Sequence, residues 1–454
     1  MASSNVGTVS VAPSISQNQN SDRADSRRWL WWFAIALMLG AVFRLVWGGA
    51  IEFKRDEAWV YRLVTDHAAT GKWTPLGMPS SQEVLVPGLS IWVFYPLSYI
   101  FGTDDPTALA RGVQFCSLSA LLLLVVFAWR CVSVEEREPW LWAAALIAVN
   151  PIAVIYQRKL WPPCMLPLFC MMFLIGWWHR DRRWGALTWG VVGVLLGQIH
   201  ASGFLFGGAV FLATVWTERR RVYWLPWLAG SVLGCLPMAG WVFYLFTKPD
   251  AVHDNFFAFN RWIEGKFWTH WTTEPLGFGL GGILGTQTSD FLRWPVLGGH
   301  PTYGGAILQG LAIVLGVLIL GKFVARRWQE RRSSRAPLSS STLIVHAIFF
   351  GYGLLLTLAA VRFYRHYLLV AFPLMALWLA QLALPRGAEG AALAWGRRRL
   401  LALAVVNALC TALLLTYLHM QGGAPGGAFG VSYEQQVRLT SQRPPRLILP
   451  IDEK

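Results

Sequence analysis

The chain has 454 residues, of which 55% are hydrophobic and 14% are charged, and its formal net charge is +15. Soluble domains typically contain about 25% charged and about 45–50% apolar residues, so this composition excludes an ordinary soluble enzyme and a disordered chain. The apolar residues are clustered in stretches that approach or reach the roughly 20 residues needed to cross a bilayer. The sequence therefore predicts an all-α polytopic membrane protein.

The order of polar and apolar segments predicts the topology. Residues 1–28 are rich in Ser, Asn and Gln and end in a basic cluster, which predicts a disordered cytoplasmic tail. Basic clusters recur between later apolar segments, and Lys and Arg concentrate in cytoplasmic loops. If each cluster marks such a loop, the transmembrane module runs from 29 to 418 with about 11 helices, at 29–49, 109–130, 139–157, 163–179, 184–200, 203–217, 222–246, 304–325, 342–361, 367–384 and 399–418.

This topology places the amino terminus in the cytoplasm and the carboxyl terminus outside. The extracytoplasmic segments are then two loops, at about 50–108 and 247–303, and a tail at 419–454. The stretch 84–101 is interrupted by Pro87, Gly88 and Pro96, so we interpret it as a membrane-surface or re-entrant element. The net charge is mainly an orientation signal, so we expect membrane lipids and no nucleic acid as partners.

Paired carboxylates follow the first predicted span directly, at Asp56 and Glu57. One interpretation is a solvated charge cluster. The other is a general base at the depth where a lipid-borne substrate presents its reactive head. Burial beneath surrounding loops and like-charge repulsion from Glu57 would raise the pKa of Asp56 above about 3.9 and make it a better base.

Two groups of cations also lie at the predicted outer membrane edge. Arg158 and Lys159 follow the third span, and Arg362, Arg365 and His366 follow the ninth. Snorkelling anchors are expected chiefly on the cytoplasmic side, whereas arginine forks suit phosphate oxygens, so these groups are candidate anion-binding residues. His200 is either a proton carrier or a packing residue, and Arg44 is either a snorkelling residue or a partner of Asp56 or Glu57. No metal site is indicated, because the six cysteines form no CxxC pair and have no His at metal-ligand spacing.

Four stretches resemble the membrane-embedded C-type (GT-C) glycosyltransferases, a group that includes the Rgt lipopolysaccharide transferases, the lipid A aminoarabinose transferase and, more distantly, protein O-mannosyltransferases. They follow one another in the family's order, over roughly residues 29–380. The stretches are Arg55-Asp56-Glu57-Ala58-Trp59 with Gly71-Lys72-Trp73; Pro87 to Gly102 with Ala108-Leu109-Ala110-Arg111; Asn150-Pro151 through Tyr156-Gln157-Arg158, with His200-Ala201-Ser202-Gly203; and Arg365-His366-Tyr367-Leu368-Leu369 with Pro373.

The resemblance implies a GT-C fold with surface helices in the first extracytoplasmic loop, and a hexosyl- or pentosyltransferase of the bacterial inner membrane. A polyprenyl-phosphate sugar would be the donor, and the acceptor would be a lipid, a glycan or a protein. Asp56 would be the general base, with Glu57 assisting. No cofactor is expected. The donor phosphate would be held by Arg158, Lys159, Arg362, Arg365, His366 and Tyr367, and the supporting residues would be Arg44, Trp73, Arg111 and His200.

Two departures and two rival functions accompany the resemblance. Val84-Leu85-Val86-Pro87 replaces a lysine and double proline of the family, and Trp161-Pro162-Pro163 replaces its RPD. A transporter or flippase is one rival, although no inverted repeat of hydropathy and no acidic pair deep in a span is evident. An O-antigen ligase or polymerase is the other, although such enzymes normally place their long outer loop late in the chain.

Overall fold

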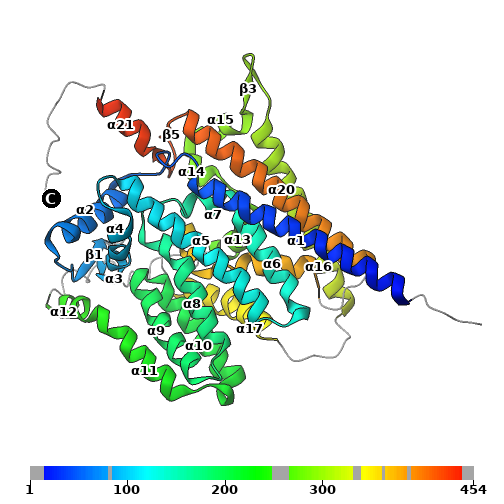
Figure 1. Ribbon diagram of the computed structural model, residues 1–454, viewed down its shortest axis with the longest axis horizontal. Coiled ribbons are helices and arrows are strands. Elements are labelled where there is room, and N and C mark those ends of the chain that lie inside the picture. The colour runs from blue at the N-terminus through cyan, green and yellow to red at the C-terminus, as the bar shows by residue number, and fades with distance from the viewer. Residues whose placement is uncertain are drawn as a thin grey trace, which may run out of the picture.

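The computed structural model of the protein describes residues 15–79, 84–247, 265–330, 339–359, 363–385 and 390–441, except for the side chains of 15–28 and 323–330. Helices form most of the described chain, and the strands pair only as short antiparallel ribbons (Figure 1). Helix α1 (Ile15–Leu45) begins inside the segment predicted to be a disordered tail. Residues 1–14 of that segment lie outside the described residues.

The loop after α1 contains only short elements after its first helix. It consists of α2 (Arg55–Thr70), β1 (Leu76–Pro79), β2 (Leu85–Pro87), α3 (Leu89–Trp92) and α4 (Tyr95–Phe101). Helix α2 ends where Gly71 takes a left-handed conformation and its N–H bonds to the carbonyl of His67. The stretch 84–101 thus forms a strand and two short helices, with no helix long enough to span a bilayer.

The next helices form the centre of the molecule. They are α5 (Pro106–Arg130), α6 (Val134–Val149), α7 (Pro151–Tyr156), η1 (Pro162–Met165), α8 (Leu166–Trp178), α9 (Arg183–Ile199), α10 (Ser202–Glu218) and η2 (Arg219–Arg221). Every residue of α6 from Trp140 to Val149 is buried, and the helix packs against α1, α5, α19 and α20. Because α6 is apolar on all sides, it can be enclosed by other helices without burying unpaired polar groups.

Two short capping motifs set the helix starts near the outer loops. Asp105 accepts a hydrogen bond from the N–H of Thr107 at 2.6 Å in front of Pro106, the first residue of α5. Asn150 accepts two hydrogen bonds from the first turn of α7, which begins with Pro151. Both follow the preference for Asp or Asn at the N-cap and for Pro at the first helical position.

The second half of the chain surrounds the central helices. It contains α11 (Trp224–Cys235), η3 (Leu236–Met238), α12 (Ala239–Thr247), α13 (Lys266–Thr273), η5 (Glu274–Leu276), α14 (Gly281–Leu284), η6 (Gly285–Gln287), α15 (Thr288–Arg293), β3 (Val296–Leu297), β4 (His300–Pro301) and α16 (Gly304–Glu330). It continues with α17 (Ser340–His346), the π-helix η7 (Ala347–Tyr352), α18 (Gly353–Leu358), η8 (Arg365–Ala371), α19 (Leu374–Ala383), α20 (Gly390–Met420), β5 (Gly423–Ala424), β6 (Gly430–Val431) and α21 (Tyr433–Ser441).

In the described part, five helical stretches are long and apolar enough to cross a membrane: Pro106–Arg130, Trp224–Thr247, Gly304–Lys322, Ser340–Leu358 and Gly390–Met420. The pair Arg365–Ala371 and Leu374–Ala383, bent by 76°, makes a sixth if it counts as one span. Each of the predicted spans overlaps a helical stretch, but the count of 11 crossings stays a prediction.

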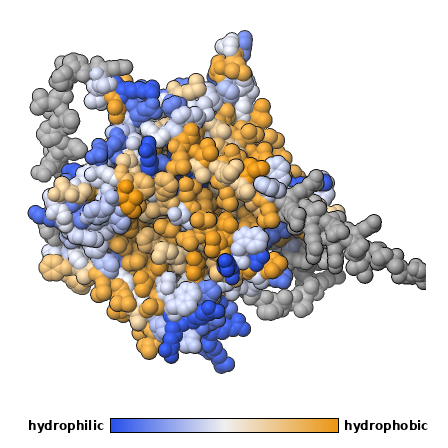
Figure 2. Space-filling view, in the orientation of Figure 1, coloured by the Kyte–Doolittle hydropathy of each residue, from blue (hydrophilic) through white to orange (hydrophobic). Residues whose placement is uncertain are grey.

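The surface is consistent with a lipid environment. Figure 2 shows a broad apolar surface between a hydrophilic patch near α21 and another at the turn between α10 and α11. Leu225 and Phe246 are 78% and 82% exposed. Such exposed apolar side chains on apolar helices are unfavourable in water and are expected where helices face lipid. The chain is therefore a multi-pass membrane protein, and the first loop and α21 lie at one end of it (Figure 1).

Candidate active site

A buried lysine joins the acidic residues of the loop that follows α1. The Nζ atom of Lys159 lies 2.9 Å from a carboxylate oxygen of Glu52 and 2.8 Å from one of Glu57. Glu57 is fully buried, and its other oxygen accepts a hydrogen bond from the N–H of Lys54 at 2.9 Å, which closes the first turn of α2. Burial by itself would lower the pKa of Lys159, but the two carboxylates raise it well above the usual range. Lys159 is therefore a permanent counter-ion of this cluster.

Asp56 differs from its acidic neighbours because its carboxylate is left without such a partner. It lies in the first turn of α2 and is half-buried, and within the described chain no hydrogen bond or ion pair engages its carboxylate. Burial raises the pKa of Asp56, and repulsion by Glu57 raises it further, although Lys159, Lys54 and Arg55 oppose both effects. The arrangement leaves one accessible carboxylate with a raised pKa, which suits a general base.

Aromatic rings connect this cluster to the segment around Arg365. The ammonium group of Lys159 lies 4.3 Å from the ring centre of Trp161, and that ring meets the ring of His366 edge to face at 4.6 Å. His366 in turn lies 5.1 Å from the ring of His200. His200 pairs with the hydroxyl of Ser202 at 2.7 Å, and the ring of Tyr367 lies 5.0 Å from His200. Lys159, His200, His366 and Tyr367, which the sequence analysis selected separately, thus form one continuous set of contacts.

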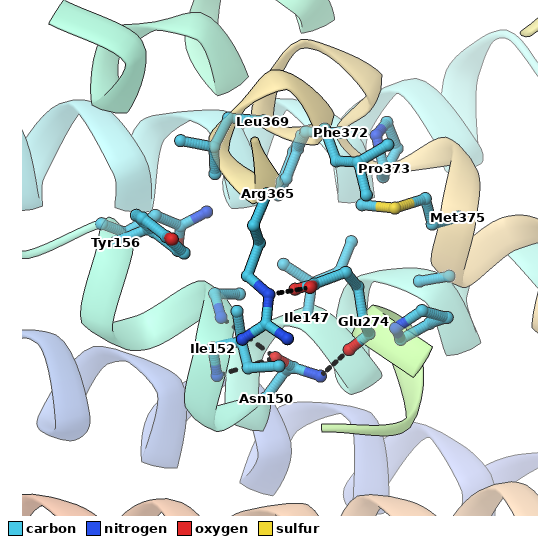
Figure 3. A pocket seen from close by; sticks show the side chains of 15 residues that line it. Ile147, Asn150, Ile152, Tyr156, Glu274, Arg365, Leu369, Phe372, Pro373 and Met375 are labelled. Atoms are coloured by element: carbon cyan, nitrogen blue, oxygen red, sulfur yellow. Dashed lines mark hydrogen bonds and ion pairs between the residues drawn. The ribbon is translucent and has the colours of Figure 1, made fainter. Parts of the chain in front are cut away.

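Arg365 extends into an apolar pocket (Figure 3). Its Nε lies 2.5 Å from a carboxylate oxygen of Glu274, and another guanidinium nitrogen donates to the carbonyl of Gly279 at 2.7 Å. The lining combines a few polar groups with many apolar side chains from α6, α7, η8 and α19. These residues are Ile147, Asn150, Ile152, Ala153, Tyr156, Gln157, Glu274, Pro275, Leu368, Leu369, Phe372, Pro373, Met375 and Ala376. An arginine at an apolar wall fits a ligand with an anionic head and a hydrocarbon chain.

Arg158, although adjacent to Lys159, is directed away from the carboxylates. Its guanidinium is buried and donates to the carbonyls of Phe43 at 2.6 Å, Trp47 at 2.9 Å and Ala50 at 3.5 Å, at and beyond the carboxyl end of α1. The last carbonyls of a helix have no partner within it, so a cation there stabilises the helix end. In this geometry the donors of Arg158 are engaged by the backbone, whereas the sequence analysis expected them on a phosphate.

Replacing Arg158 with Ala is therefore expected to act mainly on stability. The change leaves buried carbonyls unpaired, and hydrogen bonds to charged groups contribute about 1.5–3 kcal/mol each, so the apparent melting temperature in detergent should fall by several degrees. Binding of a polyprenyl phosphate by the folded protein, measured well below that temperature, should change little. A selective loss of binding with unchanged melting would return Arg158 to the phosphate site.

The supporting residues of the sequence analysis lie in different surroundings. Arg44 is fully buried and donates to Gln157, Ser117 and the carbonyls of Gly40, Ile147 and Ala148, so it ties α1 to its neighbours and pairs with neither Asp56 nor Glu57. Trp73 is 60% exposed and packs against the aromatic rings of His67, Trp92 and Tyr95. Arg111 is exposed and lies beside Gly48. Arg362 lies outside the described residues.

The carboxyl-terminal segment closes over the first outer loop. Ser432 pairs with Glu52 in an antiparallel bridge, the amide of Gln436 donates to the carbonyl of Phe53 at 2.6 Å, and Lys54 donates to the carbonyl of Ala428. On its other side the segment meets the second outer loop, where the N–H of Phe429 bonds to the carbonyl of Ile283 at 3.0 Å. The described tail is therefore fixed in place and connects the loop after α1 with the segment around α14, next to the acidic cluster.

Two residues of the site, Glu52 and Glu274, were missed in the sequence analysis. Glu52 stands four residues before Asp56 in the same predicted loop, so its position could have marked it as a site residue. Glu274 is the only carboxylate between Lys266 and Gln287, and it stands in an aromatic- and glycine-rich stretch. An acid in such an apolar setting is rarely buried without a partner, which would have predicted a cation nearby. No group of three or more His, Cys, Asp or Glu side chains in the described ranges has the spacing of a metal site.

No family model matches the chain, and no curated protein matches it. Among solved structures it is similar to ArnT from Cupriavidus metallidurans bound to undecaprenyl phosphate, with 12% identity and a TM-score of 0.43 over 87% of this chain and 78% of that one. Apo ArnT from the same organism gives 13% identity, the same TM-score and the same coverage. An apo oligosaccharyltransferase from Archaeoglobus fulgidus gives 12% identity and a TM-score of 0.47 over 91% of this chain and 58% of that one.

With TM-scores below 0.5, these similarities assign no activity, substrate or site residue to this chain. ArnT and the oligosaccharyltransferase do come from the GT-C group, which is the group that the four motifs of this chain resemble.

Proposed function

We propose that the protein is a glycosyltransferase that moves a sugar from a polyprenyl-phosphate donor to an acceptor hydroxyl at the outer face of the bacterial inner membrane. The observation that carries the proposal is Asp56, an accessible carboxylate with a raised pKa whose acidic neighbours, Glu52 and Glu57, are paired with lysines. A carboxylate that is free to accept a proton, beside carboxylates that already have lysine partners, suits proton abstraction from a hydroxyl.

In the proposed step, Asp56 removes the proton of the acceptor hydroxyl while the hydroxyl oxygen attacks the anomeric carbon of the donor. The bond between that carbon and the phosphate oxygen breaks, the electron pair stays on the departing polyprenyl phosphate, and the anomeric configuration inverts. Glu57 contributes by holding Lys159 and the first turn of α2. The reaction balances without an added cofactor.

Arg365 is the phosphate ligand in this proposal, and the apolar pocket beside it takes the first part of the lipid chain. Its guanidinium reaches into the pocket and is partly exposed, so it is available to phosphate oxygens. His366 and Tyr367 follow Arg365 in η8, and we propose them as further contacts of the donor phosphate. Lys159 does not contact the phosphate directly in this proposal, because its ammonium group is paired with the carboxylates of Glu52 and Glu57.

The experiment that tests this assignment measures donor binding by native mass spectrometry of the gently solubilised protein. Arg365→Ala is expected to weaken binding of a polyprenyl phosphate by roughly 10–100-fold, since a charge-assisted contact is lost. The control is Arg293→Ala, an exposed arginine that does not line the pocket, which should bind as the wild type does. Equal binding by wild type and Arg365→Ala, with normal melting of both, would contradict the phosphate site.

A further inference from the structure

The carboxylate of Glu274 already occupies the anion position on Arg365. It is 2.5 Å from Nε of the guanidinium, and the side chain of Glu274 is 7% exposed. Figure 3 shows the ion pair standing across the pocket, between the apolar side chains of η8 and those of α7. A ligand phosphate that approached Arg365 from the pocket would therefore compete with this carboxylate.

The backbone at Glu274 is anchored independently of its side chain. The amide of Asn150 donates to the carbonyl of Glu274 at 2.8 Å, and the N–H of Gly277 donates to the same carbonyl at 3.0 Å. Gly277 has a positive φ of 70° and lies against Asn407 and Pro151, so a larger residue would not fit there. The side chain of Glu274 can thus change its partner without a change of the backbone that carries it.

A second partner for the carboxylate is already close to it. The Nδ1 atom of His270, one turn earlier on α13, lies 3.4 Å from the same oxygen that contacts Arg365. Arg365 in turn keeps its bond to the carbonyl of Gly279, which holds the guanidinium in the pocket. When the carboxylate leaves Arg365, both groups therefore keep a polar contact, and the cost of separating the ion pair is reduced.

We propose that Glu274 is a displaceable counter-ion of Arg365, which it neutralises while the pocket is empty and releases when a lipid phosphate binds. This inference rests on the proposed function, because it takes the same pocket as the donor site. It explains how a guanidinium can be kept at an apolar wall without a ligand. It also makes Glu274 a determinant of specificity, because only an anion can exchange places with the carboxylate, and an uncharged lipid of the same length cannot.

The test compares the affinities of wild type and Glu274→Gln for a polyprenyl monophosphate and for the matching uncharged polyprenol, in detergent at fixed salt. Removing a competing charge should tighten phosphate binding roughly tenfold and leave polyprenol binding unchanged. Glu274→Asp, which keeps the charge but withdraws it from Arg365, should tighten phosphate binding to a smaller extent. It also serves as the second variant if Glu274→Gln folds poorly.

If Glu274 instead only positions Arg365, both substitutions will weaken phosphate binding, and the inference is overturned. Unchanged affinity in both variants overturns it as well. Arg365→Ala in the same titration separates the two proposals. When it weakens phosphate binding and Glu274→Gln fails to tighten it, the donor site stands and only the counter-ion exchange is wrong. When Arg365→Ala has no effect, the pocket is not the phosphate site and both proposals fail.

Discussion

Replacing Asp56 with Asn is expected to lower kcat by about 10²–10⁴-fold, the usual contribution of a general base, and to leave donor affinity close to that of the wild type. The substitution keeps the size of the side chain and removes only its ability to accept a proton. Asp56 has no ion pair or hydrogen bond to lose among the described residues, so the fold should be unaffected. The measurement is single-turnover transfer from a polyprenyl-phosphate sugar, together with donor binding and melting temperature.

The same assignment fixes the direction of the pH dependence. A base works only when it is unprotonated, so activity is lost as the pH falls through the pKa of Asp56. An ordinary aspartate has a pKa of about 3.9. Burial and Glu57 raise the pKa of Asp56, so the acid limb of kcat/KM should lie at a higher pH than for an ordinary aspartate. Lys54 lowers the pKa of Asp56, so Lys54→Met is expected to move this limb to higher pH.

The matched control for Asp56→Asn is Asp66→Asn, the same substitution on the exposed side of the same helix. It should retain full activity. Near-full transfer by Asp56→Asn would show that another group takes the proton. A parallel loss of donor binding would show that the substitution disturbs the site as a whole.

Much of the helical framework was predictable, because apolar runs and the charges between them depend on local sequence. Asp105-Pro106 and Asn150-Pro151 mark helix starts by their cap chemistry alone. Asp56 and Glu57 were expected in the loop after the first span, and both lie there, in the first turn of α2.

The hydrogen-bond and ion-pair partners of Arg158 and Lys159 were not predictable, because they depend on how the chain turns after α7. Arg158 and Lys159 are neighbours in the sequence, yet one is directed at the carbonyls of α1 and the other at two carboxylates. No local pattern distinguishes these fates. The contact of the tail with the first loop joins Gln436 to Phe53, residues 383 positions apart, so only the folded chain brings them together.

Lys159→Met is the substitution expected to cost the most stability in the site. Methionine matches the length of the lysine stem but leaves the buried carboxylate of Glu57 without a counter-ion and that of Glu52 with only the more exposed Lys54. Breaking a buried ion pair in this way costs about 3–5 kcal/mol, so the variant should melt far below the wild type in detergent. Its stability should rise as the pH falls, because each unpaired buried carboxyl has a raised pKa in the folded protein and folding then favours its protonated form.

Lys54→Met provides the control for that change, because it removes a second lysine from the same carboxylate. Lys54 lies 2.8 Å from Glu52, but its side chain is 42% exposed, and solvent-exposed pairs contribute only about 0–1 kcal/mol. Adding Glu57→Gln to Lys159→Met should restore part of the lost stability, because the unpaired charge of Glu57 is then absent. If Lys159→Met melts like Lys54→Met and the second substitution restores nothing, the cluster is not held by its lysine. Its carboxylates would then be neutral in the folded protein, so Asp56 would lose its distinction from Glu57.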